Sequence, residues 1–312
     1  MFILIPRTQS SKRRLILLAM QKITPFQFGH FELSPVETGR FLLDGGAMFG
    51  VVPKTLWSRE IPADEKNRIK MAMRSLLIKS NLTGRTYLID TGSGDKFDDK
   101  MTAIYGLDYD HSTLAGSLEM CETAPEDVSD IIFSHLHFDH CGGTTTYDKN
   151  GNLKEVFPNA IYHVNKRHWE TAINPNAREK ASFFSENLNP IKESGRLHLV
   201  EDDHEFEPGL TVIPVNGHTI GQQLPVIKHQ DKTIVFAADL FPAAAHIPLP
   251  WIMGYDMEPK VTLAEKSEIL KKAAAEKWYF FMEHDADNEV VTIKEENGKY
   301  SMDRSLTLHD IS

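Results

Sequence analysis

The chain has 312 residues, of which 41% are hydrophobic and 25% are charged, and its formal net charge is −10. This composition is that of an ordinary globular protein long enough to bury a sizeable core. The acidic balance gives no electrostatic attraction to phosphate backbones and argues against a nucleic-acid substrate. Because the only cysteines are Cys121 and Cys141, a disulfide framework does not organise the fold, and we expect reduced thiols in a cytoplasmic protein.

The first twenty residues combine a basic triplet, Lys12-Arg13-Arg14, with a short apolar run at residues 15–20. That run is too short for the apolar region of a signal peptide, and no other stretch is apolar enough to span a bilayer. We therefore expect residues 1–20 to form a disordered tail and residues 21–312 to form one domain. Met20 is an alternative natural first residue, in which case residues 1–19 are not part of the natural protein.

Short apolar strands then alternate with amphipathic helices, which predicts a layered α/β architecture. In the first half, we predict strands at residues 75–79, 86–90 and 130–134, helices at 100–106 and 112–122, and a helix start or turn at 125–127. In the second half, we predict strands at 160–164, 210–215, 233–238 and 279–282 and a helix at 262–277.

Ligand-type side chains follow the predicted strand at 130–134 directly. His135 and His137 are two residues apart, so an extended segment points both imidazoles to one side. Asp139 and His140 come next, where the chain turns. Neutral imidazole and carboxylate are ligands that zinc accepts, and they also suit manganese, cobalt and iron(II). Cys141 would have to displace a better-placed ligand, so we do not expect it to bind metal.

The complete run His135-Leu136-His137-Phe138-Asp139-His140 resembles the signature of the metallo-β-lactamase superfamily, whose fold is an αββα sandwich. The resemblance extends to three later elements of that family: His218 in Gly217-His218-Thr219, Asp239 at a strand end, and His284. It implies two zinc ions, one held by His135, His137 and His218, the other held by Asp139, His140 and His284, with Asp239 as a bridge. Asp139 and Asp239 then have catalytic roles, Asp139 in moving a proton and Asp239 in setting the metal separation.

Asp90 ends another predicted strand, in Ile89-Asp90-Thr91-Gly92. This segment resembles the family's Asp-x-Gly element, in which the aspartate supports a metal-bound histidine through a hydrogen bond. The other nine histidines, including His163, His168 and His198, lack such a context. We expect them to be solvated or locally hydrogen-bonded.

Within the family, residues 43–57, 239–246 and 251–256 resemble the YtnP-type metallo-hydrolases, a branch related to N-acyl homoserine lactonases and to methyl parathion hydrolase. This branch implies a small ester or lactone as substrate, and a quorum-quenching lactonase is the expected activity. A phosphotriesterase or phosphoesterase, or a glyoxalase II-like thioesterase, could use the same metals. The expected partner is a small-molecule substrate, and we expect no binding to nucleic acid or membrane. A homodimer is left as an open alternative to a monomer.

The same branch resemblance suggests where the substrate lies. We expect Gly45 to Phe49 to form a loop over the metals, with Met48 and Phe49 as one wall of the pocket. We expect His246 and Trp251 to form the opposite wall. Known lactonases of this branch carry a tyrosine soon after the bridging aspartate, whereas this chain has Phe241-Pro242 there and a tyrosine only at Tyr255.

Overall fold

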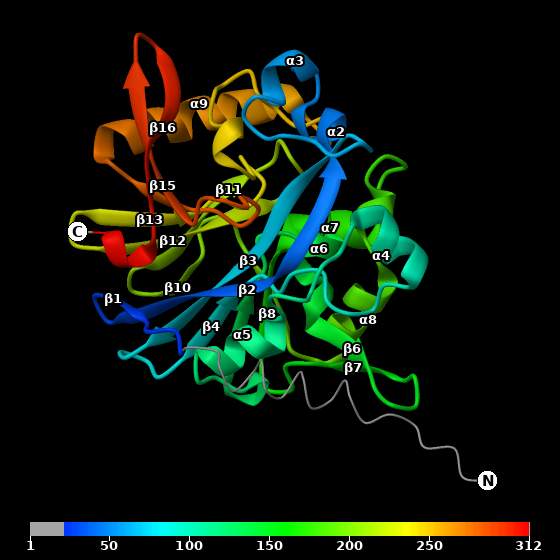
Figure 1. Cartoon of the computed structure of the whole chain (residues 1–312). Coiled ribbons are helices and arrows are strands. Elements are labelled where there is room, and N and C mark those ends of the chain that lie inside the picture. The colour runs from blue at the N-terminus through cyan, green and yellow to red at the C-terminus, as the bar shows by residue number, and fades with distance from the viewer. Residues whose placement is uncertain (1–21, 312) are drawn as a thin grey trace.

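Two seven-stranded mixed sheets lie face to face in the computed structural model, which describes residues 22–311 (Figure 1). The tail expected at residues 1–20 lies outside the described residues. In spatial order, the first sheet contains β1 (Phe26–Phe28), β2 (Phe31–Asp44), β3 (Arg68–Ser80), β4 (Thr86–Ile89), β5 (Asp130–Ile132), β8 (Ile161–Asn165) and β9 (Leu197–Val200). The second contains β10 (Glu205–Glu207), β11 (Leu210–Val215), β12 (Gln222–His229), β13 (Lys232–Phe236), β14 (Tyr279–Phe281), β15 (Val290–Glu296) and β16 (Lys299–Leu306).

Strand β4 shows how one segment serves two layers. Side chains alternate between the faces of a strand, and Tyr87 and Ile89 join the core between the sheets while Leu88 joins the core on the other face. On that other face, α5 (Leu114–Met120), α7 (Lys166–Ile173) and α8 (Ser185–Glu193) contribute Leu118, Trp169 and Ile191. The long helix α9 (Pro259–Glu276) packs against β15 of the second sheet. The αββα sandwich expected from the sequence is confirmed.

The remaining elements are short. They are α2 (Gly45–Phe49), α3 (Lys54–Trp57), α4 (Asp99–Tyr105), α6 (Phe138–Cys141) and the hairpin of β6 (Thr145–Tyr147) with β7 (Leu153–Glu155). Each predicted helix and strand overlaps an observed element, but many elements were not predicted, among them β2, β12, β15, β16, α7 and α8. Strand β2 pairs with β3 along its whole length, so long-range pairing stabilises a segment whose own pattern is interrupted by Pro35 and Gly39.

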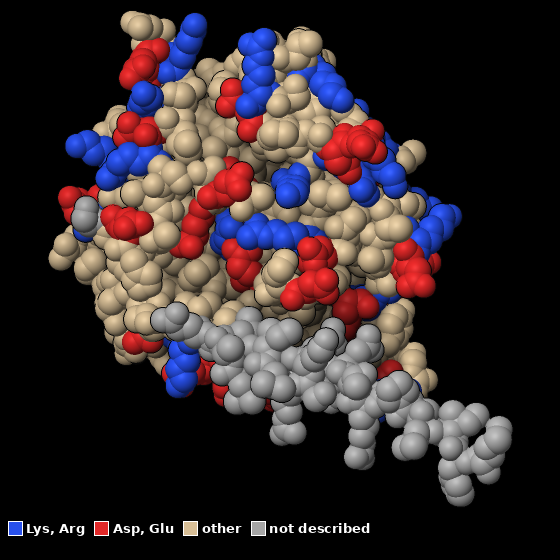
Figure 2. Space-filling model, in the orientation of Figure 1, with Lys and Arg blue, Asp and Glu red and all other residues tan. Residues whose placement is uncertain are grey.

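None of the helices in residues 22–311 combines the length and the hydropathy that a membrane span needs. On the face drawn in Figure 2, Lys and Arg side chains are interspersed with Asp and Glu side chains rather than gathered in one basic area.

Candidate metal centre

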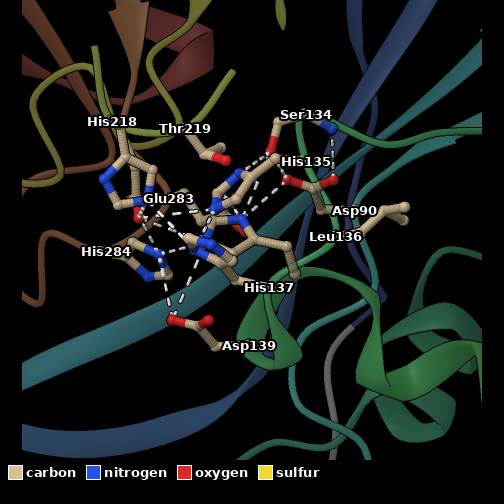
Figure 3. A network of polar contacts seen from close by, with 12 residues as sticks. Asp90, Ser134, His135, Leu136, His137, Asp139, His218, Thr219, Glu283 and His284 are labelled. Atoms are coloured by element: carbon tan, nitrogen blue, oxygen red, sulfur yellow. Dashed lines mark hydrogen bonds and ion pairs between the residues drawn. The ribbon is translucent and has the colours of Figure 1, made fainter. Parts of the chain in front are cut away.

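The candidate ligands all follow strands or lie in the short helix α6. His135 comes after β5, His218 after β11, Asp239 after β13 and His284 after β14, while Asp139 and His140 lie in α6. Strand ends hold side chains on a rigid support, so these residues meet at one edge of the sandwich although they are far apart in sequence. All seven predicted residues come together there, and all are buried. Figure 3 labels His135, His137, Asp139, His218 and His284 among them.

The turn after α6 depends on two glycines that face the loop after β4. A side chain on Gly142 would meet Ser93 O at 2.1 Å, and one on Gly143 would meet Thr91 O at 2.1 Å. The Gly pair therefore permits a close approach of the two backbone segments. This approach lets Thr91 N donate a hydrogen bond to His140 O at 2.7 Å and fixes α6 against the site.

Three imidazoles form a first group. His135 Nε2 lies 3.0 Å from His137 Nδ1, which lies 3.2 Å from His218 Nε2. Asp239 Oδ2 lies 3.2 Å from His218 Nε2 and 3.8 Å from His135 Nε2. One ligand atom from each of these residues therefore faces a common point.

A second group lies beside it. His140 Nε2 is 3.1 Å from His284 Nε2, and Asp139 Oδ2 is 3.8 Å from the first nitrogen and 3.7 Å from the second. The other oxygen of Asp239, Oδ1, lies 3.3 Å from His284 Nε2. Asp239 thus stands between the groups: Oδ1 faces the second group, and Oδ2 faces the first and also lies 3.6 Å from His140 Nε2.

Each imidazole turns its other nitrogen toward an acceptor outside the site. His137 Nε2 faces Glu179 at 3.3 Å, His218 Nδ1 faces Asp256 at 3.0 Å, and His284 Nδ1 faces the carbonyl of Ala72 at 2.9 Å. His135 Nδ1 faces Ser134 Oγ at 3.1 Å. An acceptor on the outer nitrogen keeps the proton there, so the lone pair of the inner nitrogen points into the site.

His140 turns Nδ1 toward two carboxylates, of which Asp90 is the hydrogen-bond partner. Its Nδ1 lies 3.1 Å from Asp90 Oδ2 and 3.1 Å from Glu283 Oε2. Asp90 also accepts a hydrogen bond from Ser134 N at 2.8 Å, so it ties the end of β5 to the site. Its φ of 55° and the φ of 42° at Ala238, next to Asp239, are unusual for residues with a side chain. Such strained backbone at the ends of β4 and β13 is typical of functional sites.

Three of these supporting carboxylates, Glu179, Asp256 and Glu283, have no predicted role in the sequence. Glu283 is adjacent to His284, and adjacency to a candidate ligand is the signal that could have identified it. Glu179 lies in the segment between α7 and α8 and has no motif of its own. Asp256 follows the stretch after β13, and only the fold brings it to His218.

The donor set fits divalent metal ions. Asp239 Oδ1 has no hydrogen-bond partner among the described residues although it is buried, and the inner nitrogens of His135, His137 and His218 follow one another at 3.0 and 3.2 Å. Burial opposes charge on His284, yet the carboxylates of Asp239 and Glu283 raise its pKa to about 9. In the absence of metal, protons on the imidazoles balance the negative charge of the carboxylates. Metal cations would replace these protons. Buried histidines and aspartates in this arrangement are typical of a two-metal site.

Cys141 remains outside the donor set. Its side chain is buried, lies 3.3 Å from Leu136 O and forms no disulfide. Burial raises the pKa of this thiol to about 12, so the thiolate that a metal requires is disfavoured.

A pocket of about 210 Å³ opens onto both groups and includes His137, Asp139, His218, Asp239 and His284 in its lining. Apolar side chains form one part of its wall: Leu43, Met48, Met71 and Met253. Tyr105, Tyr255 and Arg178 supply polar groups.

Of the four predicted wall residues, the structure places Met48 in the lining and the other three elsewhere. Phe49 is fully buried, stacked on Trp57 with a centroid distance of 5.1 Å and on His246 at 4.4 Å. His246 Nε2 donates to Met48 O at 3.0 Å, which fixes the layer behind the pocket. Trp251 packs edge-on against Phe49 and lines a separate hollow. The expectation is corrected for these three aromatic residues because they pack on one another.

The segment from Gly45 to Phe49 is a helix rather than a loop. Asp44 caps it by accepting a hydrogen bond from Ala47 N at 2.8 Å. Gly45 is needed for packing, since a side chain there would meet the Trp57 ring at 2.4 Å. Phe241 is also buried, against Phe280, and does not line the pocket.

Comparison with known proteins agrees with this geometry. Residues 74–284 match the family model described as the metallo-beta-lactamase superfamily. An N-acyl homoserine lactonase of Bacillus thuringiensis is 27% identical over 168 residues, which cover 53% of this chain and 59% of that protein. The chain thus matches less than two thirds of the length of such curated relatives.

Solved structures resemble the whole sandwich. A probable metal-dependent hydrolase from Staphylococcus aureus has a TM-score of 0.79 at 29% identity, covering 90% of this chain and 100% of that one. AidC, a dizinc quorum-quenching lactonase in complex with a product, has a TM-score of 0.74 at 22% identity, covering 91% and 98%, and shares the fold. The chain therefore belongs to the metallo-β-lactamase superfamily.

Proposed function

We propose that this chain is a dinuclear hydrolase that opens a lactone or cleaves a small ester carrying an apolar acyl group. The observation that carries the proposal is the position of Asp239, whose two carboxylate oxygens face two adjacent groups of ligands across 3.2 and 3.3 Å. One bridging carboxylate between two histidine-rich groups suits a pair of metal ions rather than a single one.

The ligand assignment follows the two groups. We assign one ion to His135, His137 and His218, the other to Asp139, His140 and His284, and both to Asp239. When bound, two such ions supply a nucleophile at neutral pH and polarise the carbonyl or phosphoryl oxygen that is attacked. Zinc fits the imidazole-rich donors, and Mn²⁺, Co²⁺ and Fe²⁺ are compatible with them.

Asp139 is the residue we assign to proton movement. Its carboxylate lies in the pocket lining, 3.7 Å from His284 Nε2. A carboxylate at the edge of the metal centre can take up the proton of the attacking water and pass it to the leaving alkoxide. Esters and lactones both need that proton on the alkoxide.

Tyr255 is the residue we assign to holding the substrate. It lines the pocket where the buried Phe241 cannot. Partial burial, together with the nearby Tyr105, Asp44 and Asp139, raises the pKa of Tyr255 to about 12. Its hydroxyl therefore stays protonated at neutral pH and can donate a hydrogen bond to a carbonyl oxygen of the substrate. It takes the role that a tyrosine nearer the bridging aspartate has in known lactonases.

The apolar wall favours an acyl chain. Met48, Met71 and Met253 are flexible, polarizable side chains that adapt to irregular apolar groups. A pocket with one apolar wall and few polar groups orients a small ligand by those polar groups. The names of the relatives support the same substrate class, since several are N-acyl homoserine lactonases.

A substrate panel on metal-replete protein tests the proposal. We expect N-hexanoyl and N-decanoyl homoserine lactones to be opened faster than an aryl phosphotriester or an S-acyl glutathione is cleaved, and we expect chelation to abolish turnover. Tyr255→Phe should raise KM for the lactones and leave the bound metal unchanged. Faster turnover of the phosphotriester would favour the phosphotriesterase alternative, and faster turnover of the thioester would favour the glyoxalase II-like one.

A further inference from the structure

A second histidine cluster lies outside the site described above. His163 belongs to β8, His198 belongs to the neighbouring edge strand β9, and His204 lies in the connection just before β10. One ring nitrogen from each lies within 4.8 Å of the others. The parallel register of β8 and β9 sets His163 opposite His198, so the first pair is fixed by the sheet itself.

His163 has a carboxylate hydrogen-bonded to one ring nitrogen, as metal-binding histidines usually have. Its Nε2 donates to Asp130 Oδ1 at 2.8 Å, and Asp130 is kept anionic by Arg85 Nη1 at 3.0 Å and by the Ser129 hydroxyl at 2.7 Å. With the proton on Nε2, the lone pair of Nδ1 points away from the carboxylate. A carboxylate behind an imidazole orients the ring and raises its basicity toward a metal.

That lone pair points at the next histidine. His163 Nδ1 lies 3.0 Å from His198 Nδ1, where a proton on His198 can fill the gap when no metal is bound. Zinc–nitrogen bonds of about 2.0–2.1 Å place neighbouring tetrahedral ligands roughly 3.3 Å apart, so this pair has nearly the required separation. His198 is exposed and His204 half-buried, which leaves room for His204 to close on an ion and for water to complete its coordination.

We propose that His163, His198 and His204 form a third metal site, which takes a divalent ion of the zinc class through three imidazoles. The ion would join the last strand of the first sheet to the segment that begins the second. Its role is structural because no residue of the cluster lines the pocket of the dinuclear site. Burial lowers the pKa of both His163 and His204, so both are available as neutral ligands near neutral pH.

Zinc uptake by matched variants tests this site. Wild-type protein, the double variant His198→Gln/His204→Gln and the control His111→Gln, which removes another exposed histidine, are dialysed against the same buffered Zn²⁺ and their zinc is counted. We expect the double variant to bind one ion fewer than wild type and control, with kcat unchanged. We also test proteins whose dinuclear centre is already loaded. Added zinc should raise the melting temperature of wild type and control, but not of the double variant.

Equal zinc uptake by wild type and the double variant would overturn the proposal. A variant at the supporting carboxylate provides an independent check. Asp130→Asn should weaken the third ion by roughly 10–100-fold, as loss of a partner behind a ligand does, while both exposed ligands stay in place. Unchanged affinity in that variant would contradict the assigned role of His163.

Discussion

The metal centre and the layer behind the substrate pocket are neighbours built on different principles. In the metal centre, each imidazole has an acceptor behind it, and every ligand follows a strand or lies in α6. In the layer behind the pocket, Phe49 stacks on Trp57 and His246, and Met48 is the one residue of α2 that lines the cavity. Directional polar contacts fix the first region, and mutual packing of large rings fixes the second. Substitutions in the first should therefore cost function, and substitutions in the second should cost stability.

The largest effect is expected at the bridge between the two ligand groups. Asp239→Ala should reduce kcat/KM by far more than the roughly 10–100-fold that loss of an outer partner costs, because both ions lose a ligand and their separation is no longer set. The protein should still fold, so the loss of activity should far exceed the loss of stability. Steady-state kinetics, elemental analysis and a thermal melt of the same sample measure turnover, bound metal and stability. Near wild-type turnover with two ions bound would contradict the assignment.

A packing substitution should give the opposite profile. Phe49→Ala removes a fully buried ring and should destabilise the protein by about 3–5 kcal/mol, measured by denaturant unfolding. Turnover per folded molecule should fall much less than in Asp239→Ala.

Met48→Ala is the matched variant on the same helix. It opens the lining, so it should shift the preference between hexanoyl and decanoyl lactones. If Phe49→Ala shifted acyl preference and Met48→Ala did not, the division between wall and supporting layer would be wrong.

An intermediate effect is expected one contact away from the ligands. Asp90→Asn removes the charge behind His140 Nδ1 and should cost roughly 10–100-fold in metal affinity or turnover. Glu283 contacts the same nitrogen, so Asp90→Asn/Glu283→Gln should cost more than either single change. Metal titration of the three variants measures this, and fully wild-type affinity in the double variant would remove the support assigned to both carboxylates.

The smallest effect is a pH dependence of the metal-free state. The pKa of His284 is raised from 6.5 to about 9, burial opposing the shift and Asp239 and Glu283 driving it. Its proton stabilises the metal-free fold fully below pH about 6.5, and this stabilisation is lost as pH rises to about 9. Metal must displace that proton, so metal affinity should rise as the pH increases to about 9. Titrations at pH 6.5, 7.5 and 8.5 measure the slope, and a flat profile would contradict it.

The same contrast explains what the sequence could predict. The candidate ligands could be proposed from the sequence because metal chemistry places recognisable residue types in short motifs at strand ends, as in His135 to His140. Asp90 could be proposed for the same reason. Glu179 and Asp256 were missed because an acidic residue in a connecting segment carries no local mark of the histidine that it will face.

The pocket wall was only partly predicted for a related reason. Two adjacent apolar residues, Met48 and Phe49, look equivalent in sequence, and the short helix α2 turns one to the cavity and the other to the core. His163 and His198 were expected to be solvated or locally hydrogen-bonded because neither lies in a metal-binding motif, and 35 positions separate them in the sequence. Their proximity comes from the pairing of β8 with β9.

The most direct test of the central claim is the transition-metal content of active protein that lacks the edge histidines. In the His198→Gln/His204→Gln variant, only the centre formed by the seven buried ligands remains. Elemental analysis of this variant, purified without chelators and turning over lactone, should find two ions per chain. A trace of metal in fully active protein, or one ion that cannot be increased by loading, would contradict a dinuclear centre bridged by Asp239.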